Sequence, residues 1–341
     1  MQEAHKVKYL NDPEPGNGAG PSRKTAMLKT ALGTEILAAL QDDGVTDILV
    51  NPDGSLWIDS ADKGCCATDH TLSAAMRERI IRLVASLDER VAHRNSPFVS
   101  TEIPLLEGAG VRFEGLLPPV VSMPAFVIRK PTLFQPDLQK YLQDRIIEPW
   151  QLKAIRHALE ARLNMVVAGG TGSGKTTFAN ALLAELTHRE ERLIILEDTR
   201  ELRSSATNSM FLKTRPGVAG LRDLVQSSLR LRPDRIVVGE VRGGEALELL
   251  KAWNTGHPGG ITTVHANSAS GALYRFEQLI QEVSEQVPCR LIAQAVDLVL
   301  FLEGRGGARR LREIIQVKGF TRDDYRIEKL HPANPMPDKR R

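Results

Sequence analysis

The segment with the clearest chemical potential is a glycine-rich stretch near the middle of the chain. It fits the pattern G-x-x-x-x-G-K-[ST], in which glycines allow backbone N–H groups to turn inward around phosphate oxygens. Lys175 is expected to reach the β- and γ-phosphates of a nucleotide, and the Thr176 hydroxyl is expected to bind Mg²⁺. The candidate nucleotide-binding residues are Gly170, Thr171, Gly172, Ser173, Gly174, Lys175, Thr176 and Thr177.

The setting of this stretch supports the same interpretation. The apolar run 165–168 enters it, and a helical pattern over 175–187 leaves it. Phosphate-binding loops of this type join a strand to a helix, and the helix N-terminus adds positive potential. The sequence therefore predicts a nucleoside triphosphate site rather than a chance glycine turn.

Acidic residues follow two further apolar runs. Glu240 follows 236–238, and Glu197 and Asp198 follow 193–196. In open parallel sheets, ligands bind beyond the carboxyl ends of the strands, so these carboxylates should lie near the phosphates. We expect Glu240 and Glu197 to orient the attacking water, with Glu240 also a candidate Mg²⁺ ligand. Asp198 has an alternative role as the N-cap of a following helix.

A histidine follows a third apolar run. His265 comes directly after 261–264. At a strand end beside a nucleotide, it could sense the γ-phosphate or relay its presence to a subunit contact. The alternative is a structural histidine with satisfied hydrogen bonds.

The elements that must position these residues alternate along the second half of the chain. Short apolar runs separated by helical patterns indicate a parallel sheet covered on both faces, and hence an α/β fold. The expected strands are 165–168, 193–196, 236–238 and 261–264, and the expected helices are 150–161, 175–187, 220–230 and 244–254.

The first third has a mixed pattern typical of a small α+β domain. Helices are expected at 26–40 and 73–92, and strands at 46–50, 55–58, 111–115 and 125–129. The expected organisation is a flexible tail 1–23, an N-terminal domain 24–130, a proline-marked linker 131–149, a P-loop domain 150–325 and a flexible tail 326–341.

Composition excludes several other classes of protein. The chain is 42% hydrophobic and 26% charged, which is ordinary for a globular protein, and its net charge of +3 does not favour direct nucleic-acid binding. Its 3 cysteines contain no C-x-x-C pair, which leaves a disulfide framework or a thiolate zinc site unsupported. The longest apolar stretch, 291–302, is shorter than the roughly 20 residues that span a membrane, so no transmembrane segment is expected.

Four segments together resemble the type II/IV secretion traffic ATPase family. GGTGSGKTT is similar to its Walker A segment, LEDTREL to its acidic box, RPDRIVVGEVRGGEA to its Walker B segment and GGITTVHANSA to its histidine box. The order and spacing of the segments agree over about residues 145–320. KAWNTGHPGG, which joins the last two boxes, is most similar to the conjugal-transfer branch of the family.

The resemblance implies a RecA-like P-loop motor domain with a smaller, PAS-like α+β N-terminal domain. It also implies a homo-hexameric ring, cytoplasmic and peripheral to the bacterial inner membrane. Such a ring would use ATP and Mg²⁺, and its partners would be inner-membrane components of a type IV secretion or conjugation apparatus. Its work would be conjugative pilus assembly and DNA transfer.

In this family the N-terminal domain supplies arginines to the nucleotide. Arg112 and Arg129 lie where that pattern expects them, and the alternative is that they are solvated arginines at a strand edge. Arg275, after the histidine box, is a weaker candidate.

Other readings of the motifs stay open. The first alternative function is a nucleic-acid-translocating RecA-like motor. The second, less favoured, is a P-loop small-molecule kinase. The basic run 305–312 lies in an expected hairpin, where it would act as a solvated edge that prevents strand pairing.

Overall fold

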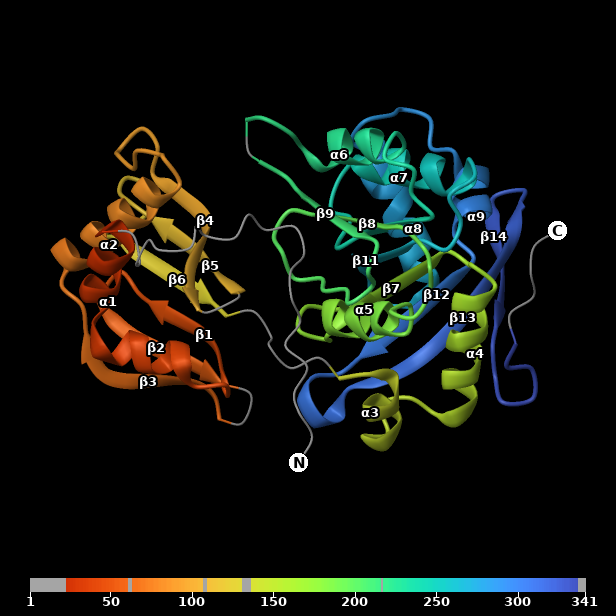
Figure 1. The fold of residues 1–341 in the computed structure, drawn as a ribbon, viewed down its shortest axis with the longest axis horizontal. Coiled ribbons are helices and arrows are strands. Elements are labelled where there is room, and N and C mark those ends of the chain that lie inside the picture. Colours follow the sequence, from red (N-terminus) through yellow and green to blue (C-terminus); the bar gives the residue numbers. More distant parts are fainter. Residues whose placement is uncertain (1–22, 61–62, 107–108, 131–135, 216, 337–341) are drawn as a thin grey trace. The chain divides into compact units, whose positions relative to one another are not determined.

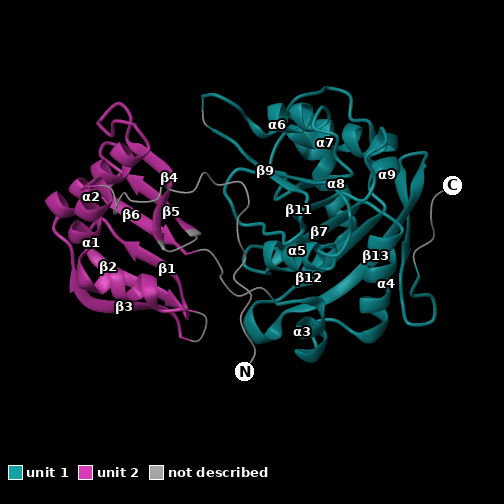
Figure 2. Ribbon diagram, in the orientation of Figure 1, with its two compact units in different colours: residues 1–11, 134–341 teal, residues 12–133 magenta. Residues whose placement is uncertain are grey.

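The computed structural model describes residues 23–60, 63–106, 109–130, 136–215 and 217–336 (Figure 1). The chain divides into two compact units, Asp12–Leu133 and a larger one formed by Phe134–Arg341 with Met1–Asn11 (Figure 2). The expected flexible tail 1–23 lies outside the described residues except for Arg23, and the terminal residues 337–341 also lie outside them.

The smaller unit is an antiparallel sheet with two helices. Its helices are α1 (Arg23–Gln41) and α2 (Ala74–Leu87), which pack on each other and on the sheet. The strands lie in the order β3-β2-β1-β6-β5-β4. Their bounds are β1 (Val45–Val50), β2 (Ser55–Ser60), β3 (Gly64–Thr71), β4 (Phe98–Leu106), β5 (Ala109–Leu116) and β6 (Ala125–Arg129).

The α+β prediction for this unit is confirmed, including both helices and the four expected strands. Sequence reasoning missed β3 and β4. Almost all of β3 is exposed at the sheet edge, so its sequence has no apolar alternation to detect. Pro104 interrupts the pattern of β4, and a proline within an apolar run argues against a strand.

The larger unit is built on one mixed sheet. Its strands lie in the order β14-β13-β12-β7-β11-β10-β8-β9, with β12 to β9 parallel and β13 and β14 antiparallel additions. The parallel strands are β7 (Met165–Gly169), β8 (Leu193–Glu197), β9 (Ser209–Lys213), β10 (Arg235–Val238), β11 (Ile261–His265) and β12 (Leu298–Glu303). The two others are β13 (Arg310–Thr321) and β14 (Asp324–Lys329).

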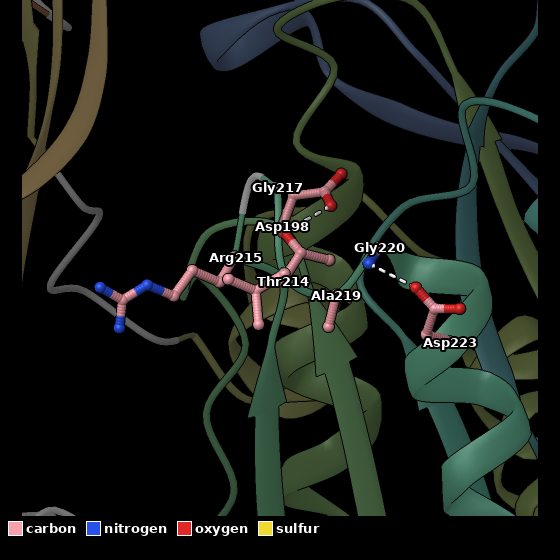
Figure 3. Close-up of a pocket in the computed structure, with 8 residues that line it drawn as sticks. Asp198, Thr214, Arg215, Gly217, Ala219, Gly220 and Asp223 are labelled. Atoms are coloured by element: carbon pink, nitrogen blue, oxygen red, sulfur yellow. Dashed lines mark hydrogen bonds between the residues drawn. The ribbon is translucent and has the colours of Figure 1, made fainter.

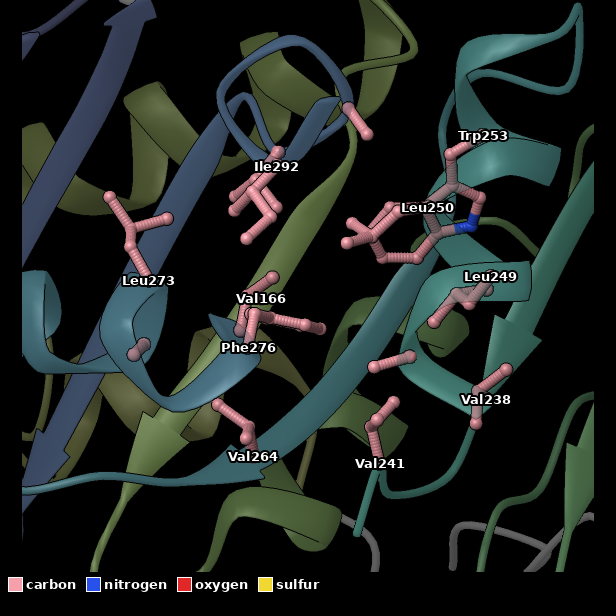
Figure 4. Packing of buried hydrophobic residues seen from close by; sticks show 14 of the residues in the cluster. Val166, Val238, Val241, Leu249, Leu250, Trp253, Val264, Leu273, Phe276 and Ile292 are labelled. Carbon is pink, nitrogen blue, oxygen red and sulfur yellow. The ribbon is translucent and has the colours of Figure 1, made fainter. Parts of the chain in front are cut away.

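Helices cover both faces of this sheet. On one face lie α6 (Leu221–Ser228), α7 (Glu245–Asn254), α8 (Ala269–Gln281) and α9 (Cys289–Ala295), and on the other lie α3 (Leu138–Gln143), α4 (Pro149–Glu160) and α5 (Lys175–Ala184). Alternate residues of β7 serve the two cores: Val166 packs against the first set of helices (Figure 4) and Val167 against the second. This alternation explains why the central strands are apolar throughout.

The expected α/β fold class is confirmed, and each of the four strands and four helices forms close to its expected range. The expected linker 131–149 is wrong from Leu138 onward, because α3 buries Leu138 and Tyr141 in the core and Pro149 begins α4. The expected C-terminal tail is wrong for its first residues, since β14 extends the sheet to Lys329.

Among the described residues, no helix combines the length and apolar character that crossing a membrane requires.

Candidate functional site

The glycine-rich loop leaves the carboxyl end of β7 and turns into α5, as the sequence predicts. Gly172 and Gly174 adopt left-handed conformations, with φ of 76° and 86°, which residues with a Cβ rarely tolerate. Gly174 is the N-cap of α5 and offers no side chain to the first-turn N–H groups. These groups and the positive end of the helix dipole therefore form a site for an anion.

Lys175 is almost buried, with 7% of its surface exposed. Its Nζ lies 3.2 Å from the Gly170 carbonyl oxygen and 3.2 Å from His265 Nδ1. Burial lowers the pKa of Lys175, while the nearby Glu240 carboxylate acts in the opposite direction. The lysine thus sits in the loop with a neutral carbonyl and a ring nitrogen as acceptors, both of which phosphate oxygens can replace.

His265 ends β11, directly opposite Gly169 of β7 in the strand register. Its Nε2 lies 2.8 Å from Glu240 Oε1. Burial, followed by the charge of Lys175, lowers the pKa of His265, which favours the neutral ring at neutral pH. Lys175 Nζ also lies 3.4 Å from His265 Nε2, so it contacts both ring nitrogens. Glu240 Oε1 is close to the ring but has no hydrogen-bond partner among the described residues.

Glu240 directly follows Gly239, at the carboxyl end of β10. Its Oε2 accepts a hydrogen bond of 2.9 Å from Arg242 Nε, so the carboxylate links His265 to a guanidinium. Sequence reasoning singled out Glu240 and His265 but missed Arg242. An arginine two residues beyond a strand-end glutamate was the available signal, since it lies within reach of the same carboxylate.

Glu197 ends β8 and is 4% exposed. Its Oε1 accepts hydrogen bonds from the backbone N–H groups of Glu201 (3.0 Å) and Leu202 (2.8 Å). A Cβ added to Gly239 would lie 3.1 Å from the same oxygen, so Glu197 packs against the residue before Glu240. Its position beside the site is as expected, and its role in orienting water stays a prediction.

Asp198 lies at the carboxyl ends of β8 and β9 rather than at the glycine-rich loop. Its Oδ1 accepts a hydrogen bond of 3.0 Å from Thr214 Oγ1 (Figure 3). The alternative role as a helix N-cap is wrong, because residues 199–208 are irregular before β9 begins.

Asp198 also lines a hollow of about 340 Å³ (Figure 3). Its lining residues come from β8, β9 and the segment leading to α6: Asp198, Thr214, Arg215, Gly217, Val218, Ala219, Gly220 and Asp223. Asp223 caps α6 by accepting a hydrogen bond of 2.8 Å from the Gly220 N–H. With two carboxylates and a capped helix, the hollow does not suit a phosphate group.

The residues at the loop fit ATP with Mg²⁺. Among the residues that the structure describes, no group of three or more His, Cys, Asp or Glu side chains could hold a metal ion by itself. Mg²⁺ usually keeps several waters and binds through one or two protein ligands plus substrate phosphates. Thr176, in the first turn of α5, and Glu240 suit such a phosphate-dependent site.

Arg112 and Arg129 are direct cross-strand partners on β5 and β6. The same row places Glu102 opposite Arg112 and Asp47 opposite Arg129, with Arg129 Nε 2.7 Å from Asp47 Oδ1. The adjacent Phe113 belongs to the core, so the charged row lies on the sheet face away from the helices. Facing like charges destabilise a sheet, and the two acids offset this.

The structure thus brings Arg112 and Arg129 together within the N-terminal unit. Their contact with a nucleotide stays a prediction. Arg275 lies on α8, where its Nη1 donates to Gln278 Oε1 at 3.1 Å, and its positive charge contributes to the lowered pKa of His265.

The basic hairpin differs from expectation. It joins β12 and β13, and β13 is not an edge strand because β14 pairs with its other side. Arg305 contacts the glycine-rich loop: its Nε donates a hydrogen bond of 3.1 Å to the Thr171 carbonyl oxygen. The expected role as a solvated guard against strand pairing is therefore wrong for this arginine.

Comparisons with known proteins show what the chain is similar to. A family described as "Type II/IV secretion system protein" matches residues 31–303, which include the loop, both acids and His265. Conjugal transfer protein TrbB of Rhizobium radiobacter is 45% identical over 308 residues, covering 90% of this chain and 94% of TrbB. Type IV secretion system protein PtlH of Bordetella pertussis is 30% identical over 345 residues, covering 88% of this chain and 97% of PtlH.

A solved structure has the same fold. The pilus retraction motor PilT with bound ADP aligns with a TM-score of 0.58 at 20% identity, covering 79% of this chain and 77% of PilT. This likeness supports the expected fold class, an α/β domain with a smaller α+β domain.

Proposed function

The chain belongs to the family of type II/IV secretion system proteins, and from that premise we propose that it hydrolyses ATP to ADP and phosphate to power type IV secretion. The observation that carries the proposal is the continuous row Lys175, His265 and Glu240 at the glycine-rich loop. It joins the lysine that binds phosphate to the carboxylate that acts on water, through a neutral imidazole.

The chemistry follows from the positions of these groups. The backbone N–H groups of the loop bind the phosphates, and Lys175 exchanges its contacts with Gly170 and His265 for phosphate oxygens. Glu240, released from part of its hydrogen bonding, orients the attacking water and takes its proton. His265 contacts both residues, so it couples the presence of the γ-phosphate to the position of Glu240. Mg²⁺, when bound, neutralises developing charge on the phosphate oxygens.

The assembly that this activity serves is a homo-hexameric ring at the cytoplasmic face of the inner membrane. TrbB is named for conjugal transfer and PtlH for a type IV secretion system, and both align along most of their length. We propose that the present protein powers assembly of a conjugative pilus and transfer of DNA. Its partners are then membrane components of the type IV secretion or conjugation apparatus.

The N-terminal unit takes part in the same cycle. Arg112 and Arg129 are cross-strand neighbours on the sheet face away from the helices, and closure of this face on ATP would tie the two units together. Hydrolysis removes the bond to the γ-phosphate and lets the units separate. We propose this alternation as the motion that performs work.

One experiment tests the activity and the assembly together. Phosphate release is measured with ATP and Mg²⁺ and no phosphoryl acceptor, and particle mass is measured with and without the nucleotide. The proposal expects steady turnover and a six-subunit ring. A monomer that releases no phosphate without a small-molecule acceptor would instead indicate a kinase and contradict the proposal.

A further inference from the structure

The hairpin between β12 and β13 begins beside the glycine-rich loop. β12 pairs in parallel with β7, and Leu302 is the register partner of Gly169, the residue at which the loop begins. β11, which carries His265, pairs with the other side of β7. The hairpin and the Lys175–His265–Glu240 row therefore flank the loop from opposite sides.

Arg305 contacts the glycine-rich loop at Thr171 and Gly172. Its Nε donates to the Thr171 carbonyl oxygen at 3.1 Å, and a Cβ added to Gly172 would lie 3.2 Å from the same nitrogen. In a trans peptide the C=O of one residue and the N–H of the next point in opposite directions. By holding the Thr171 carbonyl, Arg305 turns the Gly172 N–H to the other side of that peptide.

Arg309 covers the end of the loop at which α5 begins. A Cβ added to Gly174 would lie 2.7 Å from Arg309 Cζ, so the guanidinium occupies the space that a side chain there would need. Arg309 Nε is buried and has no hydrogen-bond acceptor among the described residues. Burial raises the pKa of Tyr141 on α3 to about 12, and the charge of Arg309 acts against this.

We propose that Arg305 and Arg309 are positioning residues for nucleotide binding, which hold the glycine-rich loop and add positive charge to it from the β12 side. The inference rests on the proposed function, since it concerns how the same loop binds a nucleoside di- or triphosphate. Two left-handed glycines, Gly172 and Gly174, each have one of these guanidinium groups packed on them. Arginine restricts the loop where glycine leaves it free.

The two arginines act on a different part of the nucleotide from Lys175. The backbone groups of such a loop bind the α- and β-phosphates, whereas the lysine reaches the β- and γ-phosphates. Loss of either arginine should therefore weaken ADP and ATP binding equally, by about tenfold, the usual effect of a hydrogen bond to a charged group. The rate at saturating ATP should stay within about twofold, because the Lys175–His265–Glu240 row is intact.

The experiment measures dissociation constants of ADP and of a non-hydrolysable ATP analogue, with Mg²⁺, for full-length Arg305→Gln and Arg309→Gln. Arg312→Gln is the matched control, because Arg312 lies in the same hairpin but is exposed and pairs with Glu303 at 2.7 Å. KM and kcat for ATP, and the melting temperature without nucleotide, are measured for each variant.

The expected result is an equal rise in both dissociation constants and in KM for the two test variants, with the control unchanged. Because Arg305 is exposed, Arg305→Gln should fold even if Arg309→Gln does not. Arg305→Lys, which keeps a donor and the charge, should recover most of the affinity. Unchanged affinities in Arg305→Gln, or a loss confined to the ATP analogue, would overturn the inference. Failure of the wild-type protein to bind either nucleotide would instead contradict the proposed function.

Discussion

The amino ends and the carboxyl ends of the parallel strands, called here the amino edge and the carboxyl edge of the eight-stranded sheet, both carry buried polar side chains. The side chains at the two ends bond to different partners. At the amino edge, Asn164 Oδ1 accepts from the Gly259 and Gly260 N–H groups at 2.8 and 2.9 Å, and Asn164 Nδ2 donates to the Ala295 carbonyl. Arg235, fully buried, donates to the carbonyls of Leu159 and Gly259 and pairs with Glu191. These side chains hold neighbouring backbone segments together at the amino ends of the strands.

At the carboxyl edge, the row at the glycine-rich loop is held by contacts between side chains, apart from the bond of Lys175 to the Gly170 carbonyl oxygen. Glu197 differs, since it accepts from two backbone N–H groups. Lys175, His265 and Glu240 form a row that Arg242 ends, and the side chain of His265 is 45% exposed. Breaking these bonds disturbs no strand, so a ligand can replace them at small cost. The difference between the edges teaches that burial of a polar group does not by itself indicate function: the identity of its partners does.

The largest effect is expected from Lys175→Ala, which should lower kcat/KM for ATP by several hundredfold. The substitution removes the cation that stabilises charge on the β- and γ-phosphate oxygens. The pKa of Lys175 is lowered because burial penalises its charged form. Replacing it should therefore change the free energy of unfolding by less than about 1 kcal/mol. Steady-state kinetics and urea unfolding measure the two quantities.

Arg235→Met is the matched variant at the amino edge and should show the opposite pattern. It leaves Glu191 and two carbonyls without their donor, which should cost about 3 kcal/mol of unfolding free energy. kcat at a temperature below melting should remain within about twofold of wild type. A large loss of activity without loss of stability in this variant would remove the distinction between the edges.

Glu240→Gln should lower kcat by about a hundredfold and leave nucleotide affinity within about twofold. Glutamine keeps the shape and the contacts with His265 but cannot accept the proton of water. The variant should retain bound ATP over the time in which the wild-type protein completes one turnover. A filter-binding assay measures the retained ATP. Glu197→Gln is the comparison: if it abolished turnover and Glu240→Gln did not, the roles of the two acids would be reversed.

Arg112→Ala and Arg129→Ala should each lower kcat/KM for ATP by about tenfold, because each removes a charged hydrogen bond proposed to reach the nucleotide. Melting temperatures should change little, since the row lies outside the core of the smaller unit. Arg82→Ala, on the exposed side of α2 where Arg82 pairs with Glu78, is the control. Wild-type kinetics in both test variants would limit the N-terminal unit to a docking role.

The smallest effect concerns pH. Burial and the charge of Lys175 lower the pKa of His265 from its ordinary value of about 6.5. The neutral ring therefore contributes to the free energy of unfolding above pH 6.5, and this contribution is lost as the pH falls through the folded-state pKa. Turnover should fall severalfold as the pH falls through the folded-state pKa of His265, because a protonated ring cannot accept from Lys175. His265→Gln should flatten this limb of the pH–rate profile. An unchanged limb would assign it to another group.

The positions of the loop, the strand-end acids and His265 at the carboxyl ends of the strands could be predicted from the sequence, because strand–loop–helix spacing fixes where each residue leaves the sheet. Their roles stay predictions. It did not predict Arg242 and Arg305, whose contacts depend on side-chain direction and on a hairpin packed against the loop by pairing of β12 with β7. It also placed a linker over α3, since short polar-rich segments hide the burial of Tyr141.

Hydrogen exchange of the wild-type protein with and without ADP and Mg²⁺ tests the difference between the edges most directly. Nucleotide binding should slow exchange of the amides in 170–176 by at least about tenfold, since they become donors to phosphate. Amides in 162–165 and 259–261, at the amino edge, should exchange at the same rate in both states. Unchanged exchange in 170–176 at saturating nucleotide would contradict the assignment of the carboxyl edge as the nucleotide site.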